Sequence, residues 1–233
     1  DGMGGHARGE IAAEVAVNSL TNRFQQEART TLRRPKEFLE SAIHSAHRAI
    51  VAFADQHDML ECPRTTIVAC IVQNGKACWA HSGDSRIYHF HAGTLVKRTR
   101  DNSYVQALVD KGELTEMQAR DHPQSNILLS CLGAEDAPQI STYSTRDLKV
   151  GDALLLCSDG LWHYFTDQEL GSALATLTPR EAAEFLISKA RQRGHGGGDN
   201  ISIIVLRLDP PMMERKATRI DMPSIADIKR GRA

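Results

Sequence analysis

Four short acidic motifs, spread over almost the whole chain of 233 residues, hold the side chains best suited to chemistry. In each motif a carboxylate stands beside a residue that lets the backbone turn sharply. The motifs are Asp1-Gly2, Gly83-Asp84, Asp159-Gly160 and Asp199-Asn200. Three of the carboxylates adjoin runs that predict β-strands, so residues distant in sequence are expected to meet at strand ends. Clustered carboxylate and carbonyl oxygens are ligands for a hard cation, Mg²⁺ or Mn²⁺, rather than for a softer metal.

Each motif also has a simpler interpretation when it is taken alone. Asp-Gly is a common turn dipeptide, which would explain Asp159. The glycine-rich segment after Asp1 could cap a helix, Asp84 could cap a hairpin, and Asp199 could stand at a loop tip. The occurrence of all four motifs in one chain favours a metal site. Two such ions can activate a water for in-line attack on a phosphoryl group, so no covalent nucleophile is needed.

The spacing of apolar residues predicts the elements that position these motifs. Helices are expected over residues 11–20, 35–53 and 103–120, in a stretch after 157, and over 178–193. Thr178, Pro179 and Glu181 form a clear start signal for the last of these helices. Strands are expected over residues 65–72, 76–81, 86–91, 94–98, 153–157 and 201–208.

The order of these elements predicts the fold class. Helices, strands, helices and strands follow one another without strict alternation, which indicates an α+β fold with antiparallel sheets covered by helices. One domain is expected over residues 1–209, followed by a polar tail over residues 210–233.

Composition limits the partners and the compartment. With 28 basic and 29 acidic residues the net charge is −1, so neither nucleic acid nor an anionic membrane is an expected partner. No apolar run approaches the ~20 residues that span a bilayer. Five cysteines without a CxxC pair indicate reduced thiols, and hence the cytoplasm.

The motifs in order resemble a known family. The segments DGMGGH, PRTTIVACIV, HSGDSRIYHF, NILLSCLG, LLLCSDGLW and GGGDNISIIVL are similar to those of the metal-dependent protein phosphatases of type 2C, in the bacterial serine/threonine branch. The resemblance covers residues 1 to about 208. It implies a four-layer α-β-β-α sandwich with two central antiparallel sheets. It also implies a monomeric enzyme whose metal-activated water hydrolyses phosphoserine or phosphothreonine in a protein, with substrates phosphorylated by a bacterial serine/threonine kinase.

The resemblance also implies roles for individual residues. Asp1 would bridge two ions, the Gly2 carbonyl would bind the second ion, and Asp159 and Asp199 would hold the first. A third ion, frequent in bacterial members, would fall between Asp84 and Asp159. The segment from residue 103 to about 126 corresponds to a mobile flap beside the cleft.

The sequence departs from the family in two places. The family's first strand carries a phosphate-binding arginine and an acidic metal ligand that would precede Asp1, so we expect the sequence to be a piece of a longer chain. Met3 stands where eukaryotic members have a histidine proposed as general acid, so Met3 is given no such role, and His6 is expected to solvate the helix start. A catalytically impaired pseudophosphatase, binding phosphoproteins as a regulator, is the alternative function.

Some other residues near the motifs also carry expectations. Arg86 is expected to pair with a carboxylate, and Trp162 to form a wall of the cleft. His89 and His91 would share one face of a strand, and we expect them to be half-exposed there rather than metal ligands.

Overall fold

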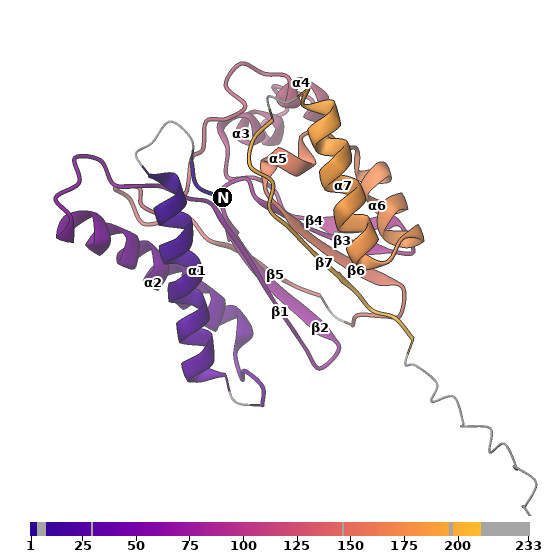
Figure 1. Ribbon diagram of the computed structural model, residues 1–233, viewed down its shortest axis with the longest axis horizontal. Coiled ribbons are helices and arrows are strands. Elements are labelled where there is room, and N and C mark those ends of the chain that lie inside the picture. The colour runs from indigo at the N-terminus through magenta and orange to yellow at the C-terminus, as the bar shows by residue number, and fades with distance from the viewer. Residues whose placement is uncertain (4–7, 29, 146, 196–197, 211–233) are drawn as a thin grey trace, which may run out of the picture.

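Two helices and three strands form one of the two halves of the structure. The computed structural model describes residues 1–3, 8–28, 30–145, 147–195 and 198–210. Helices α1 (Gly9–Glu27) and α2 (Pro35–Gln56) lie side by side over a sheet of β1 (Ile67–Gln73), β2 (Lys76–Ser82) and β5 (Ser141–Ser144), as Figure 1 shows. The strand order is β1-β2-β5, and both pairings are antiparallel.

One face of α2 holds this half together. Apolar residues at helical spacing are buried there, as the sequence pattern predicts: Phe38, Leu39, Ala42, Ile43, Ala46 and Ile50. Phe53, which the pattern places on the same face, is only half-buried, and Ala54 is buried in its stead. Ala12 and Ala16 of α1 are also buried, and their small side chains let the two helices approach closely. The result is one continuous core between the helices and the outer face of the sheet.

Four strands form the second sheet, which faces the first. They are β3 (Arg86–His91), β4 (Thr94–Arg98), β6 (Asp152–Cys157) and β7 (Ile203–Arg207). Their order is β4-β3-β6-β7, antiparallel throughout. The residue ranges expected for β3 and β4 are confirmed without change.

Three helices cover the outer face of the second sheet. They are α5 (Asp159–Trp162), α6 (Asp167–Thr176) and α7 (Pro179–Arg193). Capping boxes at Thr166 and Thr178 start α6 and α7, and the second of these confirms the helix start expected from the sequence. The chain thus forms four layers, helices, sheet, sheet and helices, which confirms the α+β fold.

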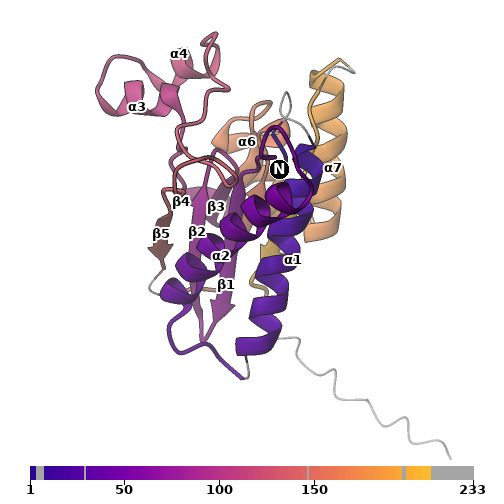
Figure 2. The ribbon, with the colours of Figure 1, turned by 90° about the vertical axis from the view of Figure 1, so that its left-hand side faces the viewer.

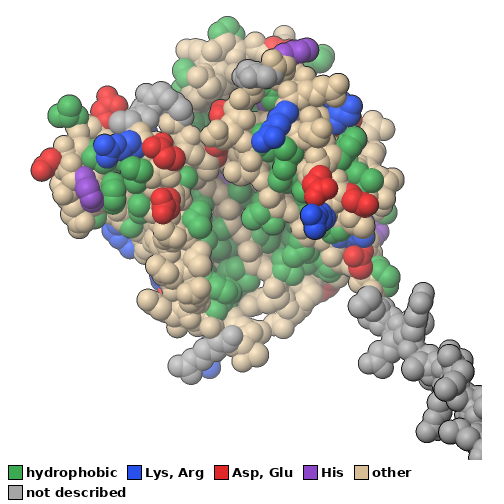
Figure 3. Space-filling view, viewed as in Figure 1, with side chains coloured by type: hydrophobic (Ala, Val, Ile, Leu, Met, Phe, Trp, Pro, Cys, Tyr) green, Lys and Arg blue, Asp and Glu red, His purple; other side chains and the backbone are tan. Residues whose placement is uncertain are grey.

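The two sheets meet through part of their inner faces. Trp79 of β2, Ile87 of β3 and Leu154 of β6 are buried there in one cluster. Figure 3 shows hydrophobic side chains along the hollow between the α1–α2 half and the half covered by α7. The edge strands β1 and β7 also carry exposed apolar side chains, among them Val72 and Ile204.

The segment between β4 and β5 differs from the sequence prediction. A single helix was expected over residues 103–120, but the structure has two short ones, α3 (Tyr104–Asp110) and α4 (Glu116–Arg120). Gly112, with φ +74°, ends the first helix, and Thr115 starts the second with a new capping box. Figure 2 shows α3 and α4 projecting beyond the sheets. Both helices lie within residues 103–126, the segment that the resemblance gives as the flap, and we keep this name for it.

Two further expectations concern membrane-spanning helices and the C-terminal tail. No helix within the described ranges is long and apolar enough to cross a membrane. The expected tail over residues 210–233 lies outside the described residues from 211 onward, and so does His6.

Gly133 provides a test of the fold beside the N-terminal segment. A Cβ at Gly133 would lie 2.1 Å from the Pro63 carbonyl oxygen, and its φ is +82°. We expect Gly133→Ala to lower the free energy of unfolding by about 3 kcal/mol, measured by urea denaturation. Gly112→Ala is the control, because Gly112 has a similar φ of +74° but open space around it. Equal losses in the two variants would contradict the steric account.

Candidate metal centre

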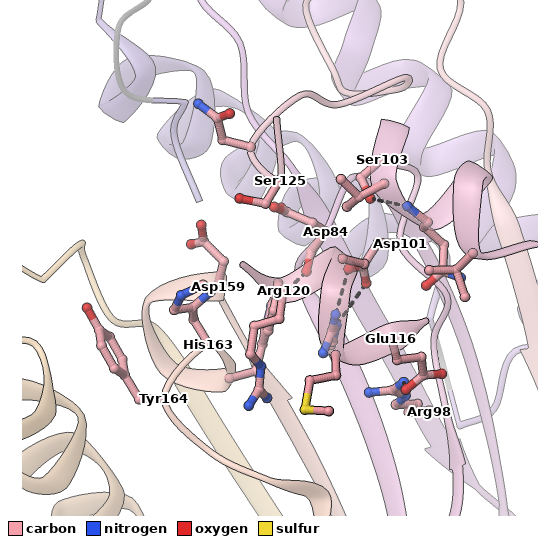
Figure 4. Close-up of a pocket in the computed structure, with 18 of the residues that line it drawn as sticks. Asp84, Arg98, Asp101, Ser103, Glu116, Arg120, Ser125, Asp159, His163 and Tyr164 are labelled. Atoms are coloured by element: carbon pink, nitrogen blue, oxygen red, sulfur yellow. Dashed lines mark hydrogen bonds and ion pairs between the residues drawn. The ribbon is translucent and has the colours of Figure 1, made fainter. Parts of the chain in front are cut away.

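A cavity of about 550 Å³ opens between the flap and one end of the second sheet. Asp84, Asp159 and Asp199, three of the carboxylates singled out in the sequence, line it together. Figure 4 shows the side chains of Asp84 and Asp159 on the same side of this cavity. Trp162 lines it too, which confirms the expectation that it forms a wall of the cleft.

Hydrogen bonds between the end of β6 and the start of β7 bring two of these carboxylates together. The Ser158 backbone N–H donates to the Ser202 carbonyl at 3.1 Å, and the Ser158 hydroxyl donates to the Asn200 carbonyl at 3.1 Å. The Ser202 N–H donates in return to the Ser158 hydroxyl at 3.0 Å. Asp159 follows Ser158, and Asp199 precedes Asn200. These three hydrogen bonds, which we call the Ser158 lock, therefore hold the two acidic residues at one site.

The third carboxylate is positioned by its backbone. Asp84 lies between β2 and β3, and its carbonyl accepts a hydrogen bond from the Trp162 indole N–H at 2.9 Å. The neighbouring Gly83 N–H donates to the Asn102 side chain at 3.1 Å. Trp162 belongs to the same short helix, α5, as Asp159. Its hydrogen bond to the Asp84 carbonyl therefore fixes Asp84 and Asp159 relative to each other.

The Arg86 side chain packs against Trp162 and holds its indole in place. Its guanidinium makes a bidentate ion pair with Asp101, at 2.8 and 2.7 Å, and lies 3.4 Å from the centre of the Trp162 ring. Its third contact is with the Tyr88 hydroxyl at 3.2 Å. The expectation that Arg86 pairs with a carboxylate is therefore confirmed.

The carboxylates of the cavity are crowded electrostatically. Burial, and then the charges of Asp159 and Asp101, raise the pKa of Asp84 to about 7. Burial, followed by repulsion from Asp199, also raises the pKa of Asp159. Arg86 lines the same cavity, but its guanidinium is paired with Asp101 and so does not offset this negative charge.

The first motif lies next to this site without lining the cavity. The Asp1 carbonyl accepts hydrogen bonds from the Thr66 N–H at 2.9 Å and from the Thr65 hydroxyl at 2.8 Å. The Thr66 hydroxyl is 2.7 Å from that of Ser85, the neighbour of Asp84. Neither Asp1 nor Gly2 is among the described residues that border the cavity.

These donors suit a hard cation. Within the described ranges, no three acidic, histidine or cysteine side chains form a complete set of metal ligands. The structure offers neighbouring carboxylates instead, and Mg²⁺ in proteins is commonly held by one or two carboxylates while it keeps several waters. All donors are oxygens and the carboxylates repel one another, so the residues present fit Mg²⁺ or Mn²⁺.

Comparison with known proteins decides the family. The sequence profile described as Protein phosphatase 2C matches residues 1–191. The chain belongs to this family. The serine/threonine phosphatase Stp of Listeria monocytogenes is 34% identical over 220 residues, which are 94% of this chain and 86% of that protein.

Solved structures agree with the family assignment. The serine/threonine phosphatase Stp1 from Staphylococcus aureus has a TM-score of 0.82 at 28% identity, covering 90% of this chain and 82% of that one. The catalytic domain of the phosphatase PstP in complex with two manganese ions has a TM-score of 0.73 at 32% identity, covering 90% and 86%. The expected fold and function, those of a metal-dependent protein serine/threonine phosphatase, are confirmed. The relatives named here are all phosphatases, so the pseudophosphatase alternative has no support.

The sequence analysis expected the flap beside the cleft, and residues of α3 and α4 do line the cavity, but it did not identify three charged residues there. Arg98 ends β4, Asp101 follows this strand, and Arg120 lies in the flap. Asp101 stands before Asn102 just after β4, the same arrangement as Asp199-Asn200, so the sequence offered a signal for it that was not used. Arg98 and Arg120 have no such signal, and only their position in the tertiary fold identifies them.

The expectation for the strand histidines was wrong for one of the two. His89 is buried and lies 3.1 Å from a carboxylate oxygen of buried Asp152, whereas His91 is half-exposed, 2.7 Å from the other oxygen. Asp152 also accepts the Lys149 N–H at 2.8 Å. The local pattern did not show that β3 is an inner strand of its sheet, between β4 and β6, where His89 is covered.

The contact between Arg86 and Trp162 can be tested directly. Arg86→Lys keeps the charge but loses the bidentate fork and the stacking on the indole. We expect this variant of the phosphatase to lose about 2 kcal/mol of unfolding free energy, with a change in tryptophan fluorescence. Arg180→Lys is the matched control, because Arg180 is exposed on α7 and, among the described residues, forms an ion pair with Glu184 alone. Equal stability of both variants would show that the fork contributes nothing.

Proposed function

We propose that Asp1, the Gly2 carbonyl, Asp159 and Asp199 hold two Mg²⁺ or Mn²⁺ ions, and that Asp84 and Asp159 can hold a third. The observation that carries the proposal is the convergence of Asp84, Asp159 and Asp199 in one cavity. The hydrogen bonds that tie Asp1 next to the Asp84 loop give further support. The PstP catalytic domain is in complex with two manganese ions, which supports the first two of the proposed sites.

The chain's own residues then prepare the reaction. When bound, such ions lower the pKa of a water and offset charge on phosphoryl oxygens. The Ser158 lock sets the separation of Asp159 and Asp199. Trp162 and residues of the flap form walls of the cavity on either side of these carboxylates. The attack is direct, and no side chain of the chain is proposed as a covalent nucleophile.

The cysteines and the named relatives indicate the biological setting. We propose a cytoplasmic, monomeric enzyme in bacterial signalling, with residues 1–209 as its catalytic domain. All five cysteines lie within the described ranges and none is in a disulfide there, as suits a reducing compartment. The substrate is a protein phosphorylated on serine or threonine by a bacterial kinase, because the named relatives are bacterial serine/threonine phosphatases.

Removal of one central carboxylate tests the proposed chemistry. Asp159→Asn should reduce Mn²⁺-dependent hydrolysis of p-nitrophenyl phosphate by about a thousandfold, because a charged ligand is lost where charge must be stabilised. Chelation of the metal should abolish the activity of the unchanged protein. Asp209→Asn is the matched control, since Asp209 is exposed and pairs with Arg207. Full activity of Asp159→Asn, or activity that survives chelation, would refute the proposal.

The close packing behind Asp159 gives a second test. A Cβ on Gly160 would lie 2.4 Å from the Asn200 carbonyl oxygen, so Gly160→Ala must push the Asp199 loop away. We expect the Mn²⁺ concentration for half-maximal activity to rise about tenfold or more, a shift of at least 1.4 kcal/mol at ~25 °C. Saturating Mn²⁺ should restore most of the rate. A lower rate with an unchanged Mn²⁺ dependence would contradict this account.

A further inference from the structure

Arg120, in the last turn of α4, differs from the other arginines of the cavity. Three arginines line it. Arg86 is engaged by Asp101, and Arg98 is engaged by Glu116 and, at 3.5 Å, by Asp167. Arg120 forms no ion pair with any described residue, so within the described part of the cavity it is the arginine whose charge is not neutralised.

Most of the hydrogen-bonding capacity of Arg120 is unused. Its Nη2 donates to the Phe165 carbonyl at 2.6 Å, and this is its one side-chain hydrogen bond among the described residues. A guanidinium carries five N–H donors in a fixed plane. The contact with Phe165 ties the flap to the turn between α5 and α6, but it explains a single donor.

The position of Arg120 separates it from the metal-binding end of the cavity. In Figure 4 its side chain extends away from the carboxylates of Asp84 and Asp159, on the far side of His163. If metal ions at those carboxylates hold the substrate's phosphate, the Arg120 guanidinium is therefore free to contact a different part of the same substrate. The cavity of about 550 Å³ has room for more than one phosphorylated side chain.

The chemistry of a guanidinium indicates what it binds there. Planar, paired N–H groups match a carboxylate, and such charge-assisted pairs are stronger than neutral hydrogen bonds. We propose that Arg120 is a specificity-determining residue that binds an Asp or Glu side chain of the substrate polypeptide, a few residues from the phosphorylated serine or threonine. This inference rests on the proposed function, and it adds a sequence preference to it.

Three phosphothreonine peptides test the preference. One carries glutamines on both sides of the phosphothreonine, one has glutamates on the N-terminal side, and one has glutamates on the C-terminal side. For the unchanged phosphatase with Mn²⁺ we expect one glutamate peptide to exceed the glutamine peptide about tenfold in kcat/KM, the effect of one charge-assisted pair. In Arg120→Gln that ratio should fall to about one, and Arg120→Lys should keep part of it.

The ratio between peptides separates binding from a merely structural role. A loosened flap would lower all three rates together and leave the ratio unchanged, which would overturn the proposal. Arg180→Gln, on the exposed face of α7, should keep both rates and ratio. The Arg120 proposal would also be overturned if the unchanged enzyme preferred neither glutamate peptide. Failure of the proposed function can be told apart from this result, because p-nitrophenyl phosphate would then not be hydrolysed with Mn²⁺ at all.

Discussion

The repulsion among carboxylates that the fold forces together is the constraint on which the site depends. Asp159 and Asp199 are separated by forty residues of sequence, yet the Ser158 hydroxyl, bonded to the Asn200 carbonyl and the Ser202 N–H, joins their strands at one point. Burial, and then the charges of Asp159 and Asp101, disfavour the ionised form of Asp84 and raise its pKa. The backbone can impose this arrangement because β6 and β7 are paired along their whole length behind it. A bound cation turns the same repulsion into affinity.

A second layer of contacts keeps the carboxylates from moving apart. The Trp162 indole bonds to the Asp84 carbonyl, and Arg86 lies against the indole while Asp101 holds Arg86. A rigid frame of this kind matters for catalysis because ligands must stay within a fraction of an ångström of their productive positions. Arg120 belongs to the opposite wall, which comes from the flap. The wall that Trp162 and Arg86 stabilise thus holds the carboxylates, and the wall formed by the flap faces the substrate.

Much of this could be predicted from the sequence, for physical reasons. Strands such as β3 and β4 follow strongly local patterns, and Thr178 with Glu181 forms a self-contained cap. The acidic motifs were recognisable because glycine or asparagine marks the turns that carry them. The break between α3 and α4 was missed because helix periodicity continues across Gly112. Arg120 was missed because its role depends on its distance from residues far along the chain, which no local pattern encodes.

The most direct measurement is anomalous X-ray scattering from crystals of the protein soaked in Mn²⁺. Our account predicts strong manganese peaks in the cavity bordered by Asp84, Asp159 and Asp199, and their loss in crystals of Asp159→Asn soaked in the same way. A cavity without peaks at a Mn²⁺ concentration that supports catalysis would contradict it. So would manganese bound only elsewhere, for instance beside Asp152 and the histidines of β3.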